Sequence, residues 1–219
     1  MQFNGAQREI VLKVVYYGPP LSGKTTNLQA IHSLLGGGVC GRLTTLDTAD
    51  DRTLFFDLLP VLIKSRSGYR IKLKLFTVPG QVIHAATRRL VLQGADGVVF
   101  VGDSQLSEAR ANGEFWQGMR QHISDNNIDP NTLPTVIQFN KRDLSNIRTD
   151  EELSAIAAKS NEPLFKAVAI RGEGVLETLH GLLQMLFVDL NRKHDFERKF
   201  HISSHEFLNG VFGAARNRT

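Results

Sequence analysis

The sequence has little cysteine and no long hydrophobic run, and each absence narrows the class of protein. Cys40 is the single cysteine among 219 residues, so no disulfide can form within the chain and a reducing compartment is expected. The longest apolar runs have the length of strands and are too short for a transmembrane helix. The sequence also shows no signal peptide and no prenylation box. We therefore expect a cytoplasmic protein.

Charge of one sign is not in large excess either. The formal net charge is +4, and 42% of the residues are hydrophobic and 22% charged, which excludes a disordered or fibrous chain. The mild positive charge permits an anionic partner, such as a phosphate or a lipid surface, without identifying one. Because nothing beyond this mild basicity favours nucleic acid, we expect no nucleic-acid partner. The length suits one domain with a short appendage.

What the sequence does contain is an alternation of strand-like and helix-like segments. Strands are predicted at residues 10–17, 58–63, 71–76, 97–101 and 135–139, with a weak strand near 165–170. Helices are predicted at residues 24–35, 108–122, 150–159 and 175–190. Strands that alternate with helices pair in parallel through right-handed crossovers. We therefore predict a three-layer α/β domain with a mostly parallel sheet over residues 1–192, and a charged tail or helix extension over residues 193–219.

A phosphate-binding motif joins the first predicted strand to the first helix. Residues 18–25, GPPLSGKT, match the pattern G-x-x-x-x-G-K-[ST]. Glycines let successive backbone N–H groups turn toward phosphate oxygens, Lys24 reaches the β- and γ-phosphates, and the Thr25 hydroxyl suits Mg²⁺. A plain Gly-Pro turn before a helix is the alternative, which the strand–loop–helix context disfavours. Nucleotide contacts are expected from Gly18, Leu21, Ser22, Gly23, Lys24, Thr25 and Thr26.

A second motif, Asn140-Lys141-Arg142-Asp143, follows the strand at residues 135–139. Ligand-binding residues are expected at this carboxyl end of a parallel sheet. Asp143 can accept from neighbouring N–H groups on the Watson–Crick edge of guanine, which adenine lacks in that arrangement. Asn140 can bridge to the other edge, and the stem of Lys141 can cover the ring face. Alone, the tetrapeptide also occurs as a solvated loop. After a P-loop it favours GTP or GDP over the ATP of a kinase or ATPase.

Other residues fit elements that respond to the γ-phosphate. In the segment TVPGQ at residues 77–81, Gly80 can place an N–H at the γ-phosphate and Gln81 can orient the attacking water. A strand-ending Pro-Gly turn is the alternative. Upstream, Thr53 can complete Mg²⁺ coordination while the γ-phosphate is present. Arg52 can supply a cation in cis to the transition state, although a loop arginine in an Asp-rich segment is more often simply solvated.

Several longer segments carry a resemblance to a known family: VVYYGP at 14–19, GKTTNL at 23–28, DRTLFFDLLP at 51–60, TVPGQV at 77–82, DGVVFV at 96–101 and NKRDL at 140–144. With them the chain closely resembles the bacterial Ras-like GTPases of the MglA type. The resemblance implies a P-loop NTPase of the Ras-like G-domain class. It implies a slow GTP hydrolase that acts as a spatial switch in gliding motility and cell polarity, with a cell pole as one place of recruitment.

The same resemblance implies a partner and a movement. The partner is a Roadblock-fold dimer of the MglB type, which accelerates hydrolysis by moving the G protein's own arginine and glutamine into place. Arg52 and Gln81 match those positions. The movement is a register shift, coupled to nucleotide state, of the strand that follows the first switch.

Three places depart from the Ras-like pattern. Thr77 stands where that pattern has an aspartate, so the outer-sphere magnesium carboxylate is absent there, a feature that the MglA group shares. Pro20 stands beside the γ-phosphate where relatives usually have glycine, which leaves open a GTP-binding interaction module with little hydrolysis. The base loop, Ser-Ala-Lys in many Ras-like proteins, is Val168-Ala169-Ile170. Ala169 can still offer its N–H to the guanine oxygen, but the lysine contact is lost.

The last segment mixes charges with phenylalanines. Phe207, Leu208, Val211 and Phe212 recur at helical spacing, which predicts a short amphipathic helix. We favour a continuation of the last predicted helix that packs on the domain. The alternative is a segment that docks on a partner or associates peripherally with an anionic membrane surface.

Overall fold

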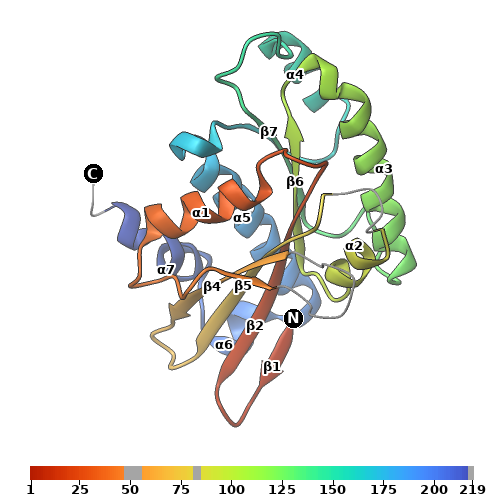
Figure 1. Cartoon of the computed structure of the whole chain (residues 1–219). Coiled ribbons are helices and arrows are strands. Elements are labelled where there is room, and N and C mark those ends of the chain that lie inside the picture. The colour runs from red at the N-terminus through yellow and green to blue at the C-terminus, as the bar shows by residue number, and fades with distance from the viewer. Residues whose placement is uncertain (47–55, 81–84, 217–219) are drawn as a thin grey trace.

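The structure, a computed structural model, describes residues 1–46, 56–80 and 85–216 (Figure 1). Its centre is an eight-stranded sheet in the order β3-β4-β5-β2-β6-β7-β8, with β1 paired to β2 outside this path. The strands are β1 Gln2–Asn4, β2 Glu9–Tyr17, β3 Thr44–Leu46, β4 Phe56–Lys64, β5 Arg70–Thr77, β6 Gly97–Asp103, β7 Thr135–Asn140 and β8 Leu164–Lys166. The α-helices are α1 Lys24–Leu35, α2 Ala85–Leu92, α3 Ala109–Asp125, α4 Asp150–Ala157, α5 Val175–His194, α6 Phe196–Phe200 and α7 Ser204–Arg216.

The sheet is parallel from β5 through β2, β6 and β7 to β8. Strand β4 runs antiparallel to both β3 and β5. Only a tight turn from Ser65 to Tyr69 joins β4 to β5, and a parallel pair would need a longer crossover. At the other edge of β2, β1 pairs in antiparallel fashion. The predicted three-layer α/β fold with a mostly parallel sheet is therefore confirmed.

Two apolar cores lie on opposite faces of the sheet. One contains buried side chains of α1, α5, α6 and α7, such as Leu28 and Leu183. The other contains those of α2, α3 and α4, such as Leu92, Phe115 and Leu153. Figure 1 shows α5 and α7 behind the strands and α2 and α3 to their right. This layering leaves the carboxyl ends of the parallel strands at one edge of the sheet.

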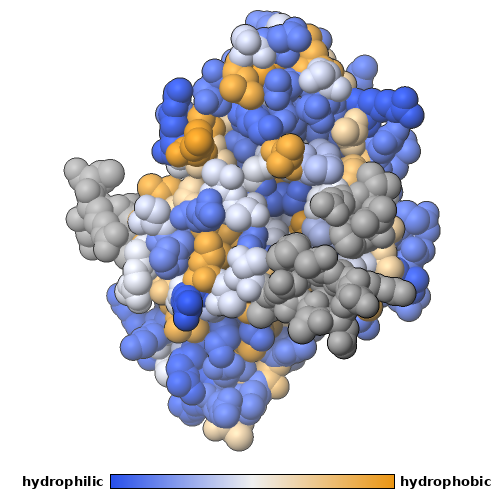
Figure 2. All heavy atoms as spheres, viewed as in Figure 1, coloured by the Kyte–Doolittle hydropathy of each residue, from blue (hydrophilic) through white to orange (hydrophobic). Residues whose placement is uncertain are grey.

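The face that bears β1, β2, β4 and β5 is turned to the viewer in Figures 1 and 2. Outside the grey atoms, Figure 2 shows this face as mostly hydrophilic, with apolar residues in separate patches. Along β4 and β5 the side chains alternate between buried and partly exposed, so one side of each strand packs in the core and the other meets solvent.

The segment after α5 does not continue that helix, contrary to the prediction, but folds back onto the domain as α6 and α7, because Asp195 and His201 have a positive φ. Phe196, Phe200, Phe207 and Val211 are buried in the same core as β4, α1 and α5. The backbone of α7 lies directly on β4, since a Cβ added at Gly210 would be 2.1 Å from Cγ2 of Ile63. The apolar side chains that the sequence offered either to the domain or to a partner are thus enclosed by the domain. Among the described residues, no helix combines the length and apolar content needed to cross a membrane.

Candidate nucleotide-binding site

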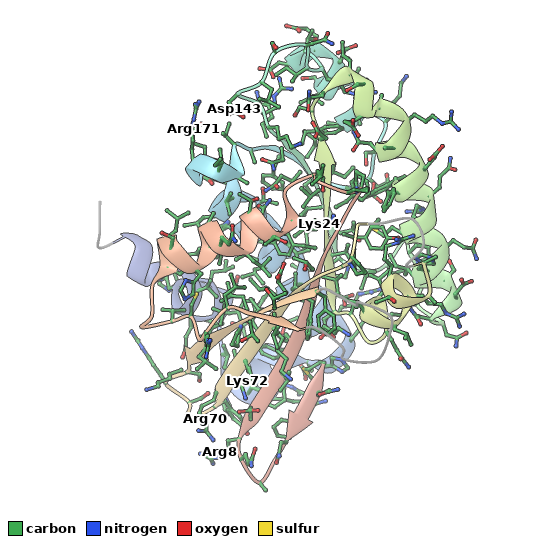
Figure 3. The ribbon with its side chains drawn as sticks, in the orientation of Figure 1. Arg8, Lys24, Arg70, Lys72, Asp143 and Arg171 are labelled. Carbon is green, nitrogen blue, oxygen red and sulfur yellow. The ribbon has the colours of Figure 1, made fainter. Side chains whose placement is uncertain are left out.

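The candidate site lies where the parallel strands end. The loop at residues 18–23 joins β2 to α1, the segment at residues 77–80 follows β5, and Asn140 closes β7 beside Asp103 at the end of β6. Parallel strands place their carboxyl ends at one edge, which is where ligands bind in open α/β sheets. Figure 3 shows Lys24 at this edge, and Asp143 above it.

The loop before α1 has a backbone conformation that requires glycine at two positions. Gly23, which precedes α1, has φ 100°, and a Cβ there would be 2.1 Å from Nδ2 of Asn140. Gly18 has φ 154°, and its Cβ would be 2.1 Å from the carbonyl oxygen of Val101. A side chain at Gly18 would require the backbone to move, and one at Gly23 would displace the amide of Asn140. Leu21 also has a positive φ, 59°, and its side chain is 86% exposed.

Lys24 is the buried cation of the loop. Only 7% of its surface is exposed, and its Nζ donates to the carbonyl oxygens of Gly18, at 2.9 Å, and Pro19, at 2.7 Å. The pKa of Lys24 is lowered to about 7, mainly by burial and also by the charge of Arg88, while the charge of Asp57 acts in the opposite direction. A polyphosphate is the kind of partner that would compensate this buried charge.

The loop contains other groups suited to an anion. The Oγ of Ser22 is buried and has no hydrogen-bond partner among the described residues, which is uncommon for a buried hydroxyl. The first turn of α1 presents backbone N–H groups that have no partner within the helix. Thr26 lines a cavity of about 300 Å³ together with Ala169. The residues present therefore fit a phosphate-bearing ligand.

Asp57 is a residue that sequence reasoning missed. Its buried carboxylate accepts from the Thr25 hydroxyl at 2.6 Å, from Thr77 at 3.0 Å and from Thr45 at 2.9 Å. The carboxylate missing from position 77 is thus supplied from β4, in contact with both Thr77 and the predicted Mg²⁺ ligand Thr25. These are hard oxygen donors of the kind that Mg²⁺ prefers. The signal in the sequence is that Asp57 shares the buried side of β4 with Leu59.

Asn140 connects the two ends of the site. Its Nδ2 donates to the carbonyl oxygen of Ser22 at 2.9 Å, and its Oδ1 accepts from the backbone N–H of Ala169 at 2.9 Å. The next residue, Lys141, has a positive φ of 64°, and its Nζ pairs with Oδ2 of Asp103 at 2.6 Å. The phosphate loop, the end of β7 and the loop after β8 are therefore held together by one amide side chain.

In the loop after β8, the protein itself uses the backbone N–H that the sequence analysis assigned to guanine. The N–H of Ala169 is bound to Asn140, whereas that of Ile170 has no acceptor among the described residues. Arg171 brings its guanidinium to 3.8 Å from the carboxylate of Asp143 (Figure 3). The sequence analysis assigned the N–H of Ala169 to the guanine oxygen and inferred that the lysine contact of the Ras-like loop is lost. Val168 closes an isolated bridge to Glu173 and is buried.

Comparison with known proteins decides the family. No family model matches the chain. It is 44% identical, over 189 residues, to Mutual gliding-motility protein MglA of Myxococcus xanthus, an alignment that covers 86% of this chain and 97% of that protein. The chain belongs to the MglA family. It is therefore a member of a family of small GTPases named for gliding motility, and its three-layer fold is that of a Ras-like G domain.

In this member of the MglA family, Gly80 approaches the phosphate loop closely. A Cβ added to Gly80 would be 2.6 Å from Cα of Pro20 and 3.3 Å from Nζ of Lys24. The backbone after β5 thus lies against the residues that the sequence placed at the γ-phosphate. The predicted catalytic residues Arg52 and Gln81 and the predicted metal ligand Thr53 lie outside the described residues.

A buried polar network supports the loop in this MglA-family domain. Asn27 donates to the Gly23 carbonyl at 2.9 Å and exchanges hydrogen bonds with Gln138 at 2.8 and 3.0 Å. Gln138 also donates to Thr178 on α5 at 2.9 Å. Gln138 is a fully buried polar residue between the apolar Ile137 and Phe139 of β7. The network joins α1, β7 and α5 directly behind the loop, which fixes where α1 begins.

Proposed function

We propose that this protein is a guanine-nucleotide switch, which binds GTP or GDP with Mg²⁺, hydrolyses GTP slowly and controls cell polarity or motility through nucleotide-dependent partner binding. The observation that carries the proposal is the double role of Asn140. It bonds Ser22 in the phosphate loop and Ala169 in the candidate base loop, so the two recognition elements form one preorganised site. Membership of the MglA family supports the same class of activity.

At the phosphate end, the proposal assigns the β- and γ-phosphates to Lys24 and the N–H groups at the start of α1. Thr25 and Thr53 would hold Mg²⁺, with Asp57 orienting Thr25 through the 2.6 Å hydrogen bond. The ion, when bound, would neutralise charge on the phosphate oxygens.

At the base end, we assign the guanine edge to Asp143. The contact between Asp143 and Arg171, 3.8 Å, holds that carboxylate near the loop after β8. The unpaired N–H of Ile170 takes the role that the sequence gave to Ala169, because the Ala169 N–H already serves Asn140. An N–H that has no acceptor among the described residues is available to the guanine oxygen.

The base assignment is tested by Asp143→Asn. The variant should weaken GDP binding and shift preference toward xanthosine diphosphate, whose edge offers an acceptor where guanine has an amino group. Dissociation constants for both nucleotides would be measured on wild type and variant. Asp129→Asn, which changes a carboxylate in the loop after α3, is the control and should leave selectivity unchanged. Unaltered selectivity in Asp143→Asn would remove this residue from the base site.

The hydrolysis assignment rests on Gln81 and Arg52, with a Roadblock-fold dimer of the MglB type as the proposed partner. Single-turnover GTP hydrolysis would be followed for wild type, Gln81→Leu and Arg52→Ala, with and without that dimer. We expect a slow wild-type rate that the dimer accelerates and that either variant loses. If all three proteins turn over alike in both conditions, these catalytic roles are wrong.

A second candidate function is a GTP-binding interaction module with little hydrolysis. The observation that favours it is the close approach of Gly80 to Pro20, because a stiff ring in contact with this backbone limits how the γ-phosphate pocket can rearrange. Pro20→Gly separates the two functions. A hydrolysis rate that rises in Pro20→Gly would support the module, and an unchanged rate would support the switch.

A further inference from the structure

A second cavity lies outside the candidate nucleotide site. It has a volume of about 540 Å³ and is bounded by β6, β7, α3 and the segment from α4 to residue 162. Its floor is apolar and aromatic, formed by Phe100, Trp116, Ile137, Phe139 and Ile156. The rings of Phe100 and Trp116 meet edge to face, with centroids 5.1 Å apart at 87°. A cavity of this size with such a floor suits a small molecule with a flat apolar body.

The polar residues of the cavity favour an anion. Arg148 and Lys159 line it, and in the part of the chain that the structure describes neither side chain forms a hydrogen bond or ion pair. The acid at the cavity, Glu162, is already compensated by Arg120 at 3.5 Å and by the Ser160 hydroxyl at 2.5 Å. The uncompensated charge at the cavity is therefore positive, which complements a carboxylate, sulfonate or phosphate.

A glycine keeps the cavity open. Gly113 lies within α3 and lines the cavity, and a Cβ added there would meet nothing within 4 Å. Glycine costs about 1 kcal/mol relative to alanine inside a helix, and no contact of the glycine itself in the structure requires it. A larger side chain at this position would project into the cavity.

A chain of hydrogen bonds and one ion pair leads from the cavity to residues 140–143. Asn112, which also lines the cavity, accepts from the N–H of Asp103 at 3.0 Å and donates to its carbonyl oxygen at 2.8 Å. The carboxylate of Asp103 pairs with Lys141 at 2.6 Å. The backbone of Arg148 bonds to Ser104, the residue after Asp103, at 2.9 Å. The wall of the cavity and residues 140–143 are therefore both attached to the end of β6.

We propose that this cavity is a binding site for a small anion with a flat aromatic or otherwise apolar body, and that occupying it stiffens residues 140–143. The stiffening of residues 140–143 would regulate nucleotide binding only if these residues hold guanine, so this part rests on the proposed function. The first half is independent of it. A neutral apolar ligand is the competing occupant, and it is an outcome of the second test below.

The first test uses the fluorescent anion 8-anilinonaphthalene-1-sulfonate on the full chain. Trp116 is the single tryptophan of the sequence and forms part of the cavity floor, so a dye bound in the cavity quenches its emission by energy transfer. We expect saturable binding of one dye per chain with quenching. Gly113→Leu should weaken binding by about tenfold or more, because the new side chain fills the space above the floor. Glu114→Leu places the same side chain on the adjacent, outward position of α3 and should bind like wild type.

Two outcomes of this test overturn the site. One is absence of saturable quenching in wild type. The other is equal dye binding in Gly113→Leu and Glu114→Leu, which would place the dye elsewhere. Thermal unfolding of both variants checks that each is folded, and leucine in place of glycine within a helix is expected to raise stability rather than lower it.

The second test addresses charge. N-phenyl-1-naphthylamine has the same ring system without the sulfonate and should bind more weakly than the anionic dye. The double variant Arg148→Gln/Lys159→Gln should weaken the anion by about threefold to tenfold and leave the neutral dye unchanged. Arg110→Gln, at an exposed position of α3 that pairs with Glu114, is the charge-matched control for one cation. If both dyes bind alike, the site is one for neutral apolar ligands and the anion assignment is wrong.

The third test addresses the coupling and does not depend on a nucleotide. Amide hydrogen exchange at residues 140–143 should slow when the anionic dye binds wild type and stay constant in Gly113→Leu. Unchanged exchange in wild type under saturating dye would overturn the coupling. Guanine-nucleotide binding measured on the same samples keeps this result distinct, because a chain that binds the dye but no guanine nucleotide contradicts the proposed function and not the cavity.

Discussion

The two ends of the candidate nucleotide site are held in different ways. At the base end, each key side chain has a partner in another element: Asn140 bonds Ser22 and Ala169, and Lys141 pairs with Asp103. At the phosphate end, Lys24 bonds only carbonyl oxygens of its own loop, and the buried hydroxyl of Ser22 has no partner among the described residues. The side chains Asn140 and Lys141 at the base end are therefore already paired within the protein, whereas Lys24 and Ser22 at the phosphate end have no anionic partner among the described residues.

The difference separates recognition from chemistry. A site whose side chains are already paired loses little entropy on binding and discriminates by leaving a wrong base unpaired. A site with a buried cation and an unpaired hydroxyl gains binding free energy mainly from the charge of its ligand. That free energy therefore depends on how many phosphates the ligand has. A switch requires this asymmetry, because the base must bind in both nucleotide states while the phosphate end must distinguish them.

The largest effect is expected from Gly23→Ala, because the new methyl group would clash with Asn140, the residue that connects the two ends. Its Cβ would be 2.1 Å from Nδ2 of Asn140, at a φ of 100° that L-residues rarely adopt. We expect a loss of about 1–3 kcal/mol in the free energy of unfolding and a fall of about 100-fold in guanine-nucleotide affinity, since Asn140 must leave Ser22. Denaturant unfolding and equilibrium nucleotide binding measure the two quantities.

The matched control is Gly38→Ala, in the turn after α1, where an added Cβ meets nothing within 4 Å and φ is not in the left-handed region. It should change neither quantity by much. Wild-type affinity in Gly23→Ala would show that Asn140 does not couple the two ends.

The contiguous parts of this site could be predicted from sequence. The phosphate motif at residues 18–25 and the segment at residues 140–143 each present their residues within one loop, so strand–loop–helix context was enough to place them at one edge of the sheet. Most predicted helices and strands appear, and α1 has the predicted bounds. Short or edge elements such as β1, β3 and α2 were missed, because a few residues carry too weak a period to be recognised.

What could not be predicted depends on contacts between distant segments. Asp57 is 32 residues from Thr25 in the chain, and only the antiparallel pairing of β4 with β5 brings its carboxylate to Thr77. The assignment of the free N–H to Ile170 depends on Asn140 taking that of Ala169, a contact across 29 residues. Pattern reasoning sees the residue types of both loops but not which donor another loop has already used.

A smaller effect, confined to the phosphate end, is expected from Asp57→Asn. The amide keeps the shape of the side chain but removes the negative charge of the carboxylate, which accepts hydrogen bonds from Thr25, Thr45 and Thr77. We expect the Mg²⁺ affinity of the nucleotide complex to fall by about 10- to 100-fold, as for other residues that orient a metal ligand, while selectivity for guanine over xanthine stays unchanged. Nucleotide release would be measured across a Mg²⁺ titration.

The control for this variant is Asp189→Asn, which neutralises a largely buried carboxylate on α5 that pairs with Arg192 and Lys193. It should retain the Mg²⁺ dependence. A loss of base selectivity in Asp57→Asn would mean that the two ends are not separable, and the comparison between them would fail.

The smallest expected effect is the protonation of Lys24. Burial, as the main cause, places the pKa of Lys24 at about 7 in the free protein, below its ordinary value. A bound polyphosphate favours the charged ammonium and raises the pKa, so above pH 7 nucleotide binding must take up a proton at this side chain. At pH 8, calorimetric heats of GDP binding should differ between Tris and HEPES in proportion to their ionisation enthalpies, and affinity should fall as pH rises from 7. Lys24→Arg keeps its charge throughout this range and should show neither effect. Equal heats in both buffers for wild type would mean that Lys24 is already charged before the ligand arrives. Protonation of Lys24 would then not be one of the differences between the two ends of the site.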